Sequence, residues 1–245
     1  MKFRINILPY KIQKLLVMIR NELIKYNYIY QIYIKYIRKH LLGKELYFVN
    51  KTTDIIIEGF PRSANTFCYK AFSLAQNKSL KIAHHTHLSS QIIKGVKLGI
   101  PTLVLIRRPL DTVISHYLKD KLANPFISIL NYINFYKKIL PYKNKFIVGE
   151  FNQIINNLDK IIEKINDKYN IDFKIFYPTK KNIKKAFILI DIANEIRGQN
   201  SPFQSSKPRI EKKIAKEKIK KDLLKDKTFK KKLRRAELLY RLMVQ

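Results

Sequence analysis

The sequence predicts an α/β fold in which a parallel sheet is flanked by helices, and three observations lead to this prediction. From residue 54 onward, short runs rich in β-branched residues alternate with longer segments of helical periodicity, as in βαβ units. The 245 residues suffice for one α/β domain with its own core, but not comfortably for two. Polar and basic residues directly follow several of the apolar runs, at the sheet edge where parallel sheets bind ligands.

Each element is expected from its own pattern. The predicted strands are Ile55–Glu58, Leu80–Ala83, Thr102–Ile106, Phe146–Val148 and, as a fifth, Phe173–Phe176. The predicted helices cover residues 65–76, 89–98, 109–119, 126–140, 151–168 and 180–195. Pro109 and Pro125 open two of these helices, because a proline at the first helical position lacks only an N–H group that would have no partner there.

The chain is expected to have three parts. Residues 1–50 form a basic helical N-terminal extension, residues 51–206 the α/β domain, and residues 207–245 a C-terminal basic helix packed on that domain. Residues 10–40 alternate apolar and basic side chains at helical spacing, which suits helices packed on the domain or lying on an anionic membrane surface. Residues 197–209 are a polar, proline-punctuated loop that could serve as a lid.

The bulk composition narrows the classes of partner and the compartment. The formal charge of +32, from 50 Lys and Arg against 18 Asp and Glu, suits nucleic acid, an anionic membrane or an acidic ligand. Lys, Ile, Asn and Tyr are abundant together, however, which favours a compositional bias over a dedicated polyanion groove. A single cysteine, Cys68, excludes an internal disulfide and fits a reducing compartment, and it is expected to pack within a helix. Without a run of about 20 apolar residues, the protein is expected to be cytoplasmic, with peripheral membrane contact as an open alternative.

A phosphate-binding loop is predicted directly after the first strand. The segment Gly59–Phe67 begins with a glycine, continues through small residues and leads into a helix. Against the nucleotide-binding pattern GxxxxGK[ST], Ala64 and Asn65 occupy the glycine and lysine positions, while Thr66 is retained. Arg62 lies inside the loop, where its guanidinium can face an anion in a forked geometry. The sequence therefore predicts a P-loop NTPase-like fold whose loop binds a phosphate-like group rather than ATP.

Backbone N–H groups of this loop, with the hydroxyls of Ser63 and Thr66, are the expected phosphate ligands, although both hydroxyls could instead cap the helix. A second polar segment, His84–His87, follows the second strand. A metal site is disfavoured because no nearby cysteine or carboxylate completes a ligand shell, and because an extended backbone sends His84 away from its neighbours. A general base and a hydrogen-bonded structural histidine are equally compatible with this spacing.

A third polar segment begins where the third strand ends. Arg107 closes the strand, and Ser115 lies about two turns into the following helix. Together these two side chains could hold a second phosphate, and Asp111 could orient one of the arginines. An arginine at a strand end is by itself a weak indication of a phosphate site. The indication is stronger here because an altered phosphate loop lies some forty residues earlier in the chain.

These residues resemble the PAPS-dependent sulfotransferases, particularly their bacterial branch with its P-loop-like fold. Gly59–Phe67 is similar to the loop that holds the 5′-phosphosulfate in that family, and Arg107 to Ser115 is similar to its 3′-phosphate motif. Thr86-His87-Leu88 resembles the segment that carries the family's catalytic base. The resemblance covers about residues 54–176 and, more loosely, residues 206–209.

The resemblance implies a sulfotransferase that moves a sulfuryl group from 3′-phosphoadenosine 5′-phosphosulfate (PAPS) to a hydroxyl or amine. It implies His87 as the base, Arg62 as a clamp on the developing charge, and no metal. The implied donor-binding residues are Pro61, Arg62, Ser63, Ala64, Asn65, Thr66, Phe67, Arg107 and Ser115. The acceptor would be a carbohydrate, lipid or small molecule, with no specific nucleic acid partner.

Two positions depart from the family pattern. Ala64 stands where the family usually has glycine, a change that costs energy only if the position needs a left-handed backbone. Arg62 stands where many members have lysine, and a guanidinium that stays protonated cannot donate its proton to a leaving group. Two other readings remain open: a non-catalytic basic protein that binds nucleic acid or anionic membrane, and a P-loop kinase, against which the missing lysine at Asn65 counts.

Overall fold

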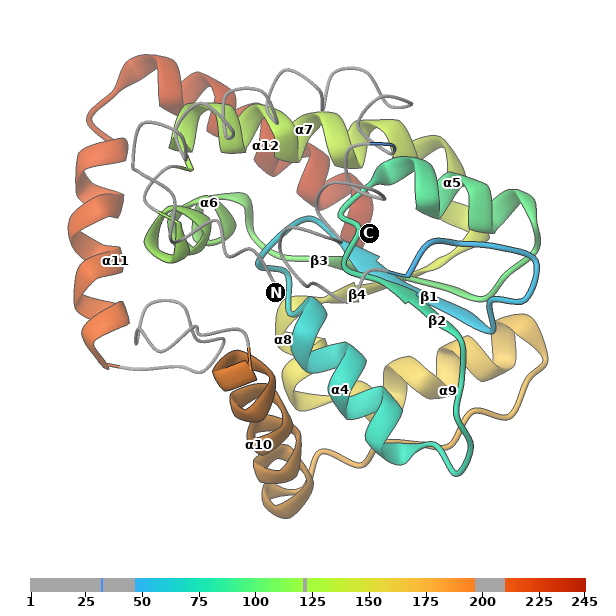
Figure 1. The fold of residues 1–245 in the computed structure, drawn as a ribbon. Helices are drawn as coiled ribbons and strands as arrows, with labels where there is room; N and C mark the ends of the chain where they lie inside the picture. Colours follow the sequence, from blue (N-terminus) through green and yellow to red (C-terminus); the bar gives the residue numbers. More distant parts are fainter. Residues whose placement is uncertain (1–31, 33–46, 121–122, 197–209) are drawn as a thin grey trace.

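The computed structural model describes residues 32, 47–120, 123–196 and 210–245, and it confirms the predicted α/β class. Its four-stranded sheet has the order β2-β1-β3-β4, and every pairing is parallel (Figure 1). The strands are β1 (Ile55–Gly59), β2 (Ile82–His84), β3 (Thr102–Ile106) and β4 (Ile147–Glu150). All residues of β1 and β3 are buried, because helices cover both faces of the sheet, and this explains their nearly continuous apolar runs.

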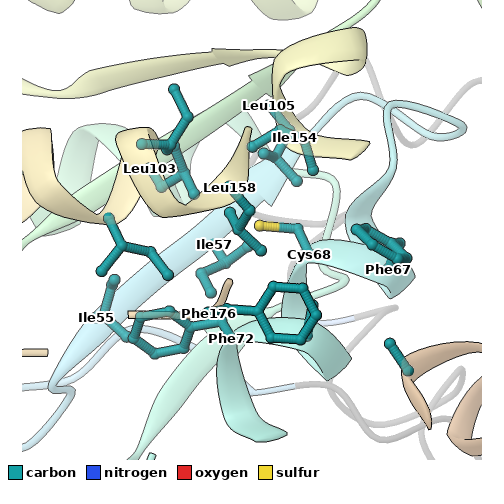
Figure 2. Packing of buried hydrophobic residues seen from close by; sticks show 14 of the residues in the cluster. Ile55, Ile57, Phe67, Cys68, Phe72, Leu103, Leu105, Ile154, Leu158 and Phe176 are labelled. Atoms are coloured by element: carbon teal, nitrogen blue, oxygen red, sulfur yellow. The ribbon is translucent and has the colours of Figure 1, made fainter. Parts of the chain in front are cut away.

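One face of the sheet packs against helices that follow β1 and β4. These are α4 (Asn65–Ala75), α8 (Phe151–Asn156), α9 (Leu158–Tyr169) and α10 (Lys180–Ile196). Ile55 and Ile57 of β1 point into this layer beside Leu103 and Leu105 of β3, because alternate strand residues share a face (Figure 2). Cys68 is fully buried among them, so the prediction that it serves helix packing is confirmed, and burial raises the pKa of its thiol.

The opposite face carries a second core. It is covered by α5 (Ser89–Lys97), α6 (Pro109–Lys119), α7 (Pro125–Ile139), the 3₁₀ helix η3 (Leu140–Lys145) and α12 (Lys227–Val244). The largest side chains here are Tyr132 and Tyr136 of α7, both fully buried, which pack with Phe229 of α12. The remaining helix, α11 (Ile210–Leu223), packs against α6 at the margin of the molecule (Figure 1).

The predicted strand over Phe173–Phe176 is wrong, since the segment forms no strand. Side chains satisfy its backbone instead: Phe173 exchanges hydrogen bonds with the amide of Asn166, and Lys174 does so with the amide of Gln76. Phe176 is nevertheless buried, in the core against α4. The apolar pattern of this segment therefore predicted the burial of Phe176 correctly. A buried segment forms a strand only if another strand lies beside it to pair with, and the pattern does not predict that.

Two predicted helices are divided in the structure. The helix expected over residues 151–168 breaks at Asn157, which ends α8 and precedes α9. The C-terminal segment forms α11 and α12 rather than one helix, because the side chain of Asp226 accepts a hydrogen bond from the Phe229 N–H (2.7 Å) and starts a new helix. The helix predicted within residues 1–50 falls largely outside the described residues, as does the predicted lid at 197–209. None of the helices in the described ranges is both long and apolar enough to cross a membrane.

Candidate active site

The strand order reverses between β1 and β3, which lie side by side in the sheet. The chain leaves β1 through α4 to reach β2 on one side, whereas β3 and β4 lie on the other side. Open α/β sheets bind ligands at such a reversal of strand order. The loop after β1 and Arg107 after β3 therefore meet at the position where the fold favours a site.

The loop after β1 has an unusual backbone. Gly59 starts it in close contact with β3, where an added Cβ would collide with the Leu105 carbonyl oxygen. Arg62 and Ala64 then have positive φ values of 74° and 69°. Positive φ at two such positions, with Ser63 between them, is a pattern that turns successive N–H groups toward one side and favours anion binding.

Ala64 has the left-handed backbone for which the sequence analysis expected alanine to cost energy relative to glycine. It precedes α4 and makes no side-chain cap. The first hydrogen bond of α4 runs from the Cys68 N–H to the Ala64 carbonyl (2.9 Å), so the preceding N–H groups of the helix start have no partner within the helix. Strain of this kind in non-glycine residues often marks functional sites.

Three predicted ligands converge beside this loop. Arg62 Nε donates to Ser115 Oγ at 3.0 Å, and Arg107 Nη1 lies 3.4 Å from the Arg62 carbonyl oxygen. Tyr132 fixes the end of β3 by donating its hydroxyl to the Arg107 carbonyl (2.8 Å), and the guanidinium of Arg107 lies 3.9 Å from the centre of the Phe151 ring. The loop and the Arg107–Ser115 segment thus form one cluster.

The cluster carries excess positive charge. Burial and, to a smaller extent, the nearby charge of Arg107 together lower the pKa of Arg62 to about 10. Burial also lowers the pKa of Arg107, although Asp111 and Glu150 partly compensate. In the described part of the chain, no carboxylate forms an ion pair with either guanidinium. Two partly buried arginines arranged in this way are expected to attract an anion.

Lys216 of α11 adds a third cation that the sequence did not suggest. Its pKa is lowered by burial first, and then by the charges of Arg107 and Arg62, with Asp111 acting in the opposite direction. The side chain is partly buried because α11 packs on α6, the helix that carries Asp111 and Ser115. Local sequence offered no signal for Lys216, since α11 is rich in lysines and only the packing of helices selects this one.

His87 and Glu58 form a pair next to the start of the loop. His87 Nδ1 lies 2.7 Å from the Gly59 carbonyl oxygen and 3.4 Å from Glu58 Oε1. The side chain of His87 is 16% exposed, so its ring reaches solvent, whereas Glu58 is 1% exposed. Glu58 was missed at the sequence level, although a carboxylate inside an otherwise apolar strand was a visible signal.

The other two histidines are arranged differently from the prediction. An extended segment was expected to separate His84 from His85, but His85 and His87 have positive φ values of 59° and 55°. His84 and His85 consequently lie in contact, with their Nδ1 atoms 2.6 Å apart, and His85 Nε2 contacts Thr66 Oγ1 at 3.1 Å. Among the described residues, no group of three or more His, Cys, Asp or Glu side chains is arranged to hold a metal ion.

Several predicted loop ligands have side chains directed into the protein. The side chain of Phe67 is buried in the core, where its ring packs against those of Phe176 and Phe187. Ser63 is fully buried, with its hydroxyl 3.5 Å from that of Tyr136. Asn65 is buried and donates to the Phe60 carbonyl (3.0 Å). Pro61 is partly buried within the loop.

The fold and the site define an α/β protein with a phosphate-loop-like turn after its first strand. No protein-family model and no curated protein matches the sequence. Among solved structures, the fold is similar to a mouse sulfotransferase, SULT7A1, complexed with PAP, with a TM-score of 0.40 and 13% sequence identity. The similarity covers 57% of this chain and 65% of that chain.

Proposed function

We propose that this protein is a sulfotransferase that uses PAPS as donor and a hydroxyl or amine of a carbohydrate, lipid or small molecule as acceptor. The observation that carries the proposal is the contact of Arg62 with Ser115, 53 residues apart, beside Arg107. A ligand with two separated anionic groups suits a cluster in which two arginines and Lys216 have no carboxylate in ion-pair contact among the described residues, and in which Asp111 and Glu150 offset the positive charge only partly.

Each group has a role in this proposal. The donor supplies a sulfuryl group on a phosphate leaving group. The loop N–H groups and Arg62 would stabilise charge that develops on the phosphosulfate, and Arg107 with Ser115 would hold the 3′-phosphate. His87 Nε2 would take the proton from the acceptor as the acceptor oxygen or nitrogen bonds to sulfur, and the sulfur–oxygen bond to phosphate breaks. The products would be the sulfated acceptor and adenosine 3′,5′-bisphosphate.

A kinase fits less well. Asn65 occupies the position of the phosphate-binding lysine, and its side chain is buried and donates a hydrogen bond to the Phe60 carbonyl. The loop therefore has no side chain at that position to reach a terminal phosphate.

Calorimetric titration with adenosine 3′,5′-bisphosphate tests the proposal. We expect saturable 1:1 binding that Arg107→Ala weakens at least tenfold, because a lost charge-assisted contact costs about 1.5–3 kcal/mol. Arg234→Ala removes the same charge from an exposed position on α12 and serves as the matched control. Absence of saturable binding, or equal effects of the two variants, would reject the proposal.

The same experiment separates the basic-protein alternative. Binding of a polyanion through scattered surface charge weakens steeply with salt and depends little on any one residue. We therefore expect Arg107→Ala to weaken nucleotide binding at least tenfold while leaving any binding of RNA or acidic vesicles unchanged.

A further inference from the structure

Glu58 is a buried carboxylate at the end of β1 with an unusual set of partners. Its Oε2 accepts hydrogen bonds from the Thr86 N–H (2.7 Å) and hydroxyl (2.6 Å), and its Oε1 accepts from the Gly59 N–H (3.1 Å). Burial by itself raises the pKa of Glu58, but His87, Thr86 and Gly59 together lower it below its ordinary value, so Glu58 is ionised. No Lys or Arg of the described residues pairs with this charge, and His87 is its one ion-pair partner there.

The contacts of His87 determine which ring nitrogen carries its proton. A carbonyl oxygen can only accept, so the 2.7 Å contact with Gly59 requires a proton on Nδ1. Nε2 of the neutral ring then carries the lone pair. The positive φ of His87 redirects the chain after β2, and Thr86, held at both N–H and hydroxyl by Glu58, anchors that turn.

We infer that Glu58 is a positioning residue for His87: it anchors the turn that presents the imidazole and supplies the negative charge that stabilises the ring when Nε2 takes up a proton. This inference rests on the proposed function, in which that proton comes from the acceptor. The ring then holds protons on both nitrogens, and Glu58 remains a carboxylate throughout, so no proton passes to it. A buried carboxylate beside a catalytic histidine has this effect in other hydrolytic and transfer enzymes.

Other ionisable groups near the pair do not replace Glu58. The His85 ring lies 5.9 Å from the His87 ring, but His85 contacts Thr66 and His84 and carries no negative charge. Tyr136 lies close enough to Glu58 to interact with its charge, and burial raises the pKa of Tyr136, which keeps the phenol neutral. Glu58 is thus the negative charge that faces His87 among the described residues.

Glu58→Gln tests the inference, because it keeps the shape of the side chain while removing the charge. We expect ¹⁵N NMR of the wild-type protein at pH 7.5 to show His87 with protonated Nδ1 and unprotonated Nε2, with the resonances assigned by His87→Gln. In Glu58→Gln the Gly59 carbonyl still holds the proton on Nδ1, so the neutral tautomer should stay the same, but without the carboxylate charge the ring should take up its second proton, on Nε2, only at a lower pH than in the wild type. Glu163→Gln, on the exposed surface of α9, removes the same charge and should leave the His87 spectrum unchanged.

Turnover gives the second measurement, with PAPS as donor and phenol and methyl galactoside as probe acceptors. A purely structural role of Glu58 would change binding and stability alike, whereas a positioning role lowers kcat by roughly 10- to 100-fold with KM for PAPS nearly constant. A neutral wild-type His87 protonated on Nε2, or a Glu58→Gln ring that takes up its second proton at the same pH as the wild type, overturns the inference. The NMR result decides this even if neither probe is sulfated and adenosine 3′,5′-bisphosphate does not bind, so failure of the proposed function is a separate outcome.

Discussion

At the scale of single residues, the buried charge of Arg62 lowers the stability of the folded protein but favours the binding of an anion. Burial and the charge of Arg107 lower the pKa of Arg62 to about 10, which means that folding disfavours its charge at every pH below that value. The shift corresponds to roughly 3 kcal/mol before solvent screening, which reduces it for a partly exposed group. A bound anion would remove this electrostatic cost, so the buried charge is favourable only when a ligand is present.

Arg62→Met should therefore stabilise the protein without ligand. We expect the free energy of unfolding at pH 7 to rise by about 1 kcal/mol after the lost hydrogen bond to Ser115 is included. The variant should also lose the increase in Tm that adenosine 3′,5′-bisphosphate gives the wild type. Urea unfolding with and without the nucleotide measures both effects, with Arg234→Met as control. A destabilised variant that still binds the nucleotide would contradict the electrostatic account.

Ala64→Gly should also stabilise the protein. At φ 69° alanine has a steric clash that glycine lacks, so the substitution relieves strain in the folded loop. Glycine also makes the unfolded chain more flexible, which offsets part of this stabilisation but not all of it. The expected increase is about 0.5–1 kcal/mol, or roughly 2 °C in Tm. Differential scanning calorimetry checks it, and Ala75→Gly in α4 should lower Tm because that residue is helical. A lower Tm for Ala64→Gly would show that the loop does not need its left-handed backbone.

Glu58 predicts a specific response to acid. Its folded pKa lies below the ordinary value of 4.5, so the carboxylate contributes stability that is fully present above about pH 4.5 and lost as pH falls through the folded value. The difference in unfolding free energy between wild type and Glu58→Gln should therefore be largest at pH 6 and shrink by pH 3. Urea titrations at several pH values measure the difference. A gap that does not vary with pH would mean that packing rather than charge explains the effect.

At the scale of elements, α11 brings a cation to a cluster built otherwise from the ends of β1 and β3. Lys216 interacts with Arg62 and Arg107 through charge, and α11 reaches them by packing on α6. The helix itself is only weakly amphipathic: Ile210 and Ile214 are exposed, and its buried residue is Lys212. Its orientation thus has more direct consequences for the site than for the core.

Lys216→Ala should weaken adenosine 3′,5′-bisphosphate binding about tenfold, because it removes one of three cations from the cluster. Lys213→Ala on the exposed side of the same helix is the matched control and should have no effect. Calorimetric titration at 50 mM and 200 mM salt gives the comparison. Equal losses for both lysines would point to general surface charge instead of a contact made by Lys216.

At the scale of the whole molecule, the basic C-terminal segment cannot be removed as an independent tail. Helix α12 contributes Phe229, Leu233, Ala236, Leu239 and Met243 to the core that it shares with α7. Its exposed face carries basic side chains, so the charge lies on one side of a helix whose other side stabilises the fold.

Deletion of residues 227–245 should therefore unfold the domain, and Phe229→Ala alone should cost about 3–5 kcal/mol. Lys230→Ala, at an exposed position one residue away, should change the unfolding free energy by less than about 0.5 kcal/mol. Circular dichroism during thermal and urea unfolding measures these effects. A truncated chain that unfolds cooperatively at the wild-type temperature would show that α12 is an appendage.

Much of the fold was predictable because strand and helix patterns are local. The isoleucine run of β1 and the Leu-Val-Leu-Ile run of β3 indicated buried parallel strands, and both lie where expected. The false strand at Phe173–Phe176 had the same apolar character, but whether an apolar segment pairs with a strand depends on neighbours that are distant in the sequence. The break at Asn157 likewise reflects packing that periodicity does not report.

By itself, the sequence determined which chemistry is present: an altered phosphate loop with Arg62, a histidine after the second strand, and Arg107 with Ser115 after the third. Only the tertiary structure decided which atoms meet, because contacts across 53 residues depend on strand order and helix packing. It turned Phe67 and the Ser63 hydroxyl inward, joined Glu58 to His87, and selected Lys216 among many lysines. Residue type is a local property, whereas burial and proximity belong to the folded chain.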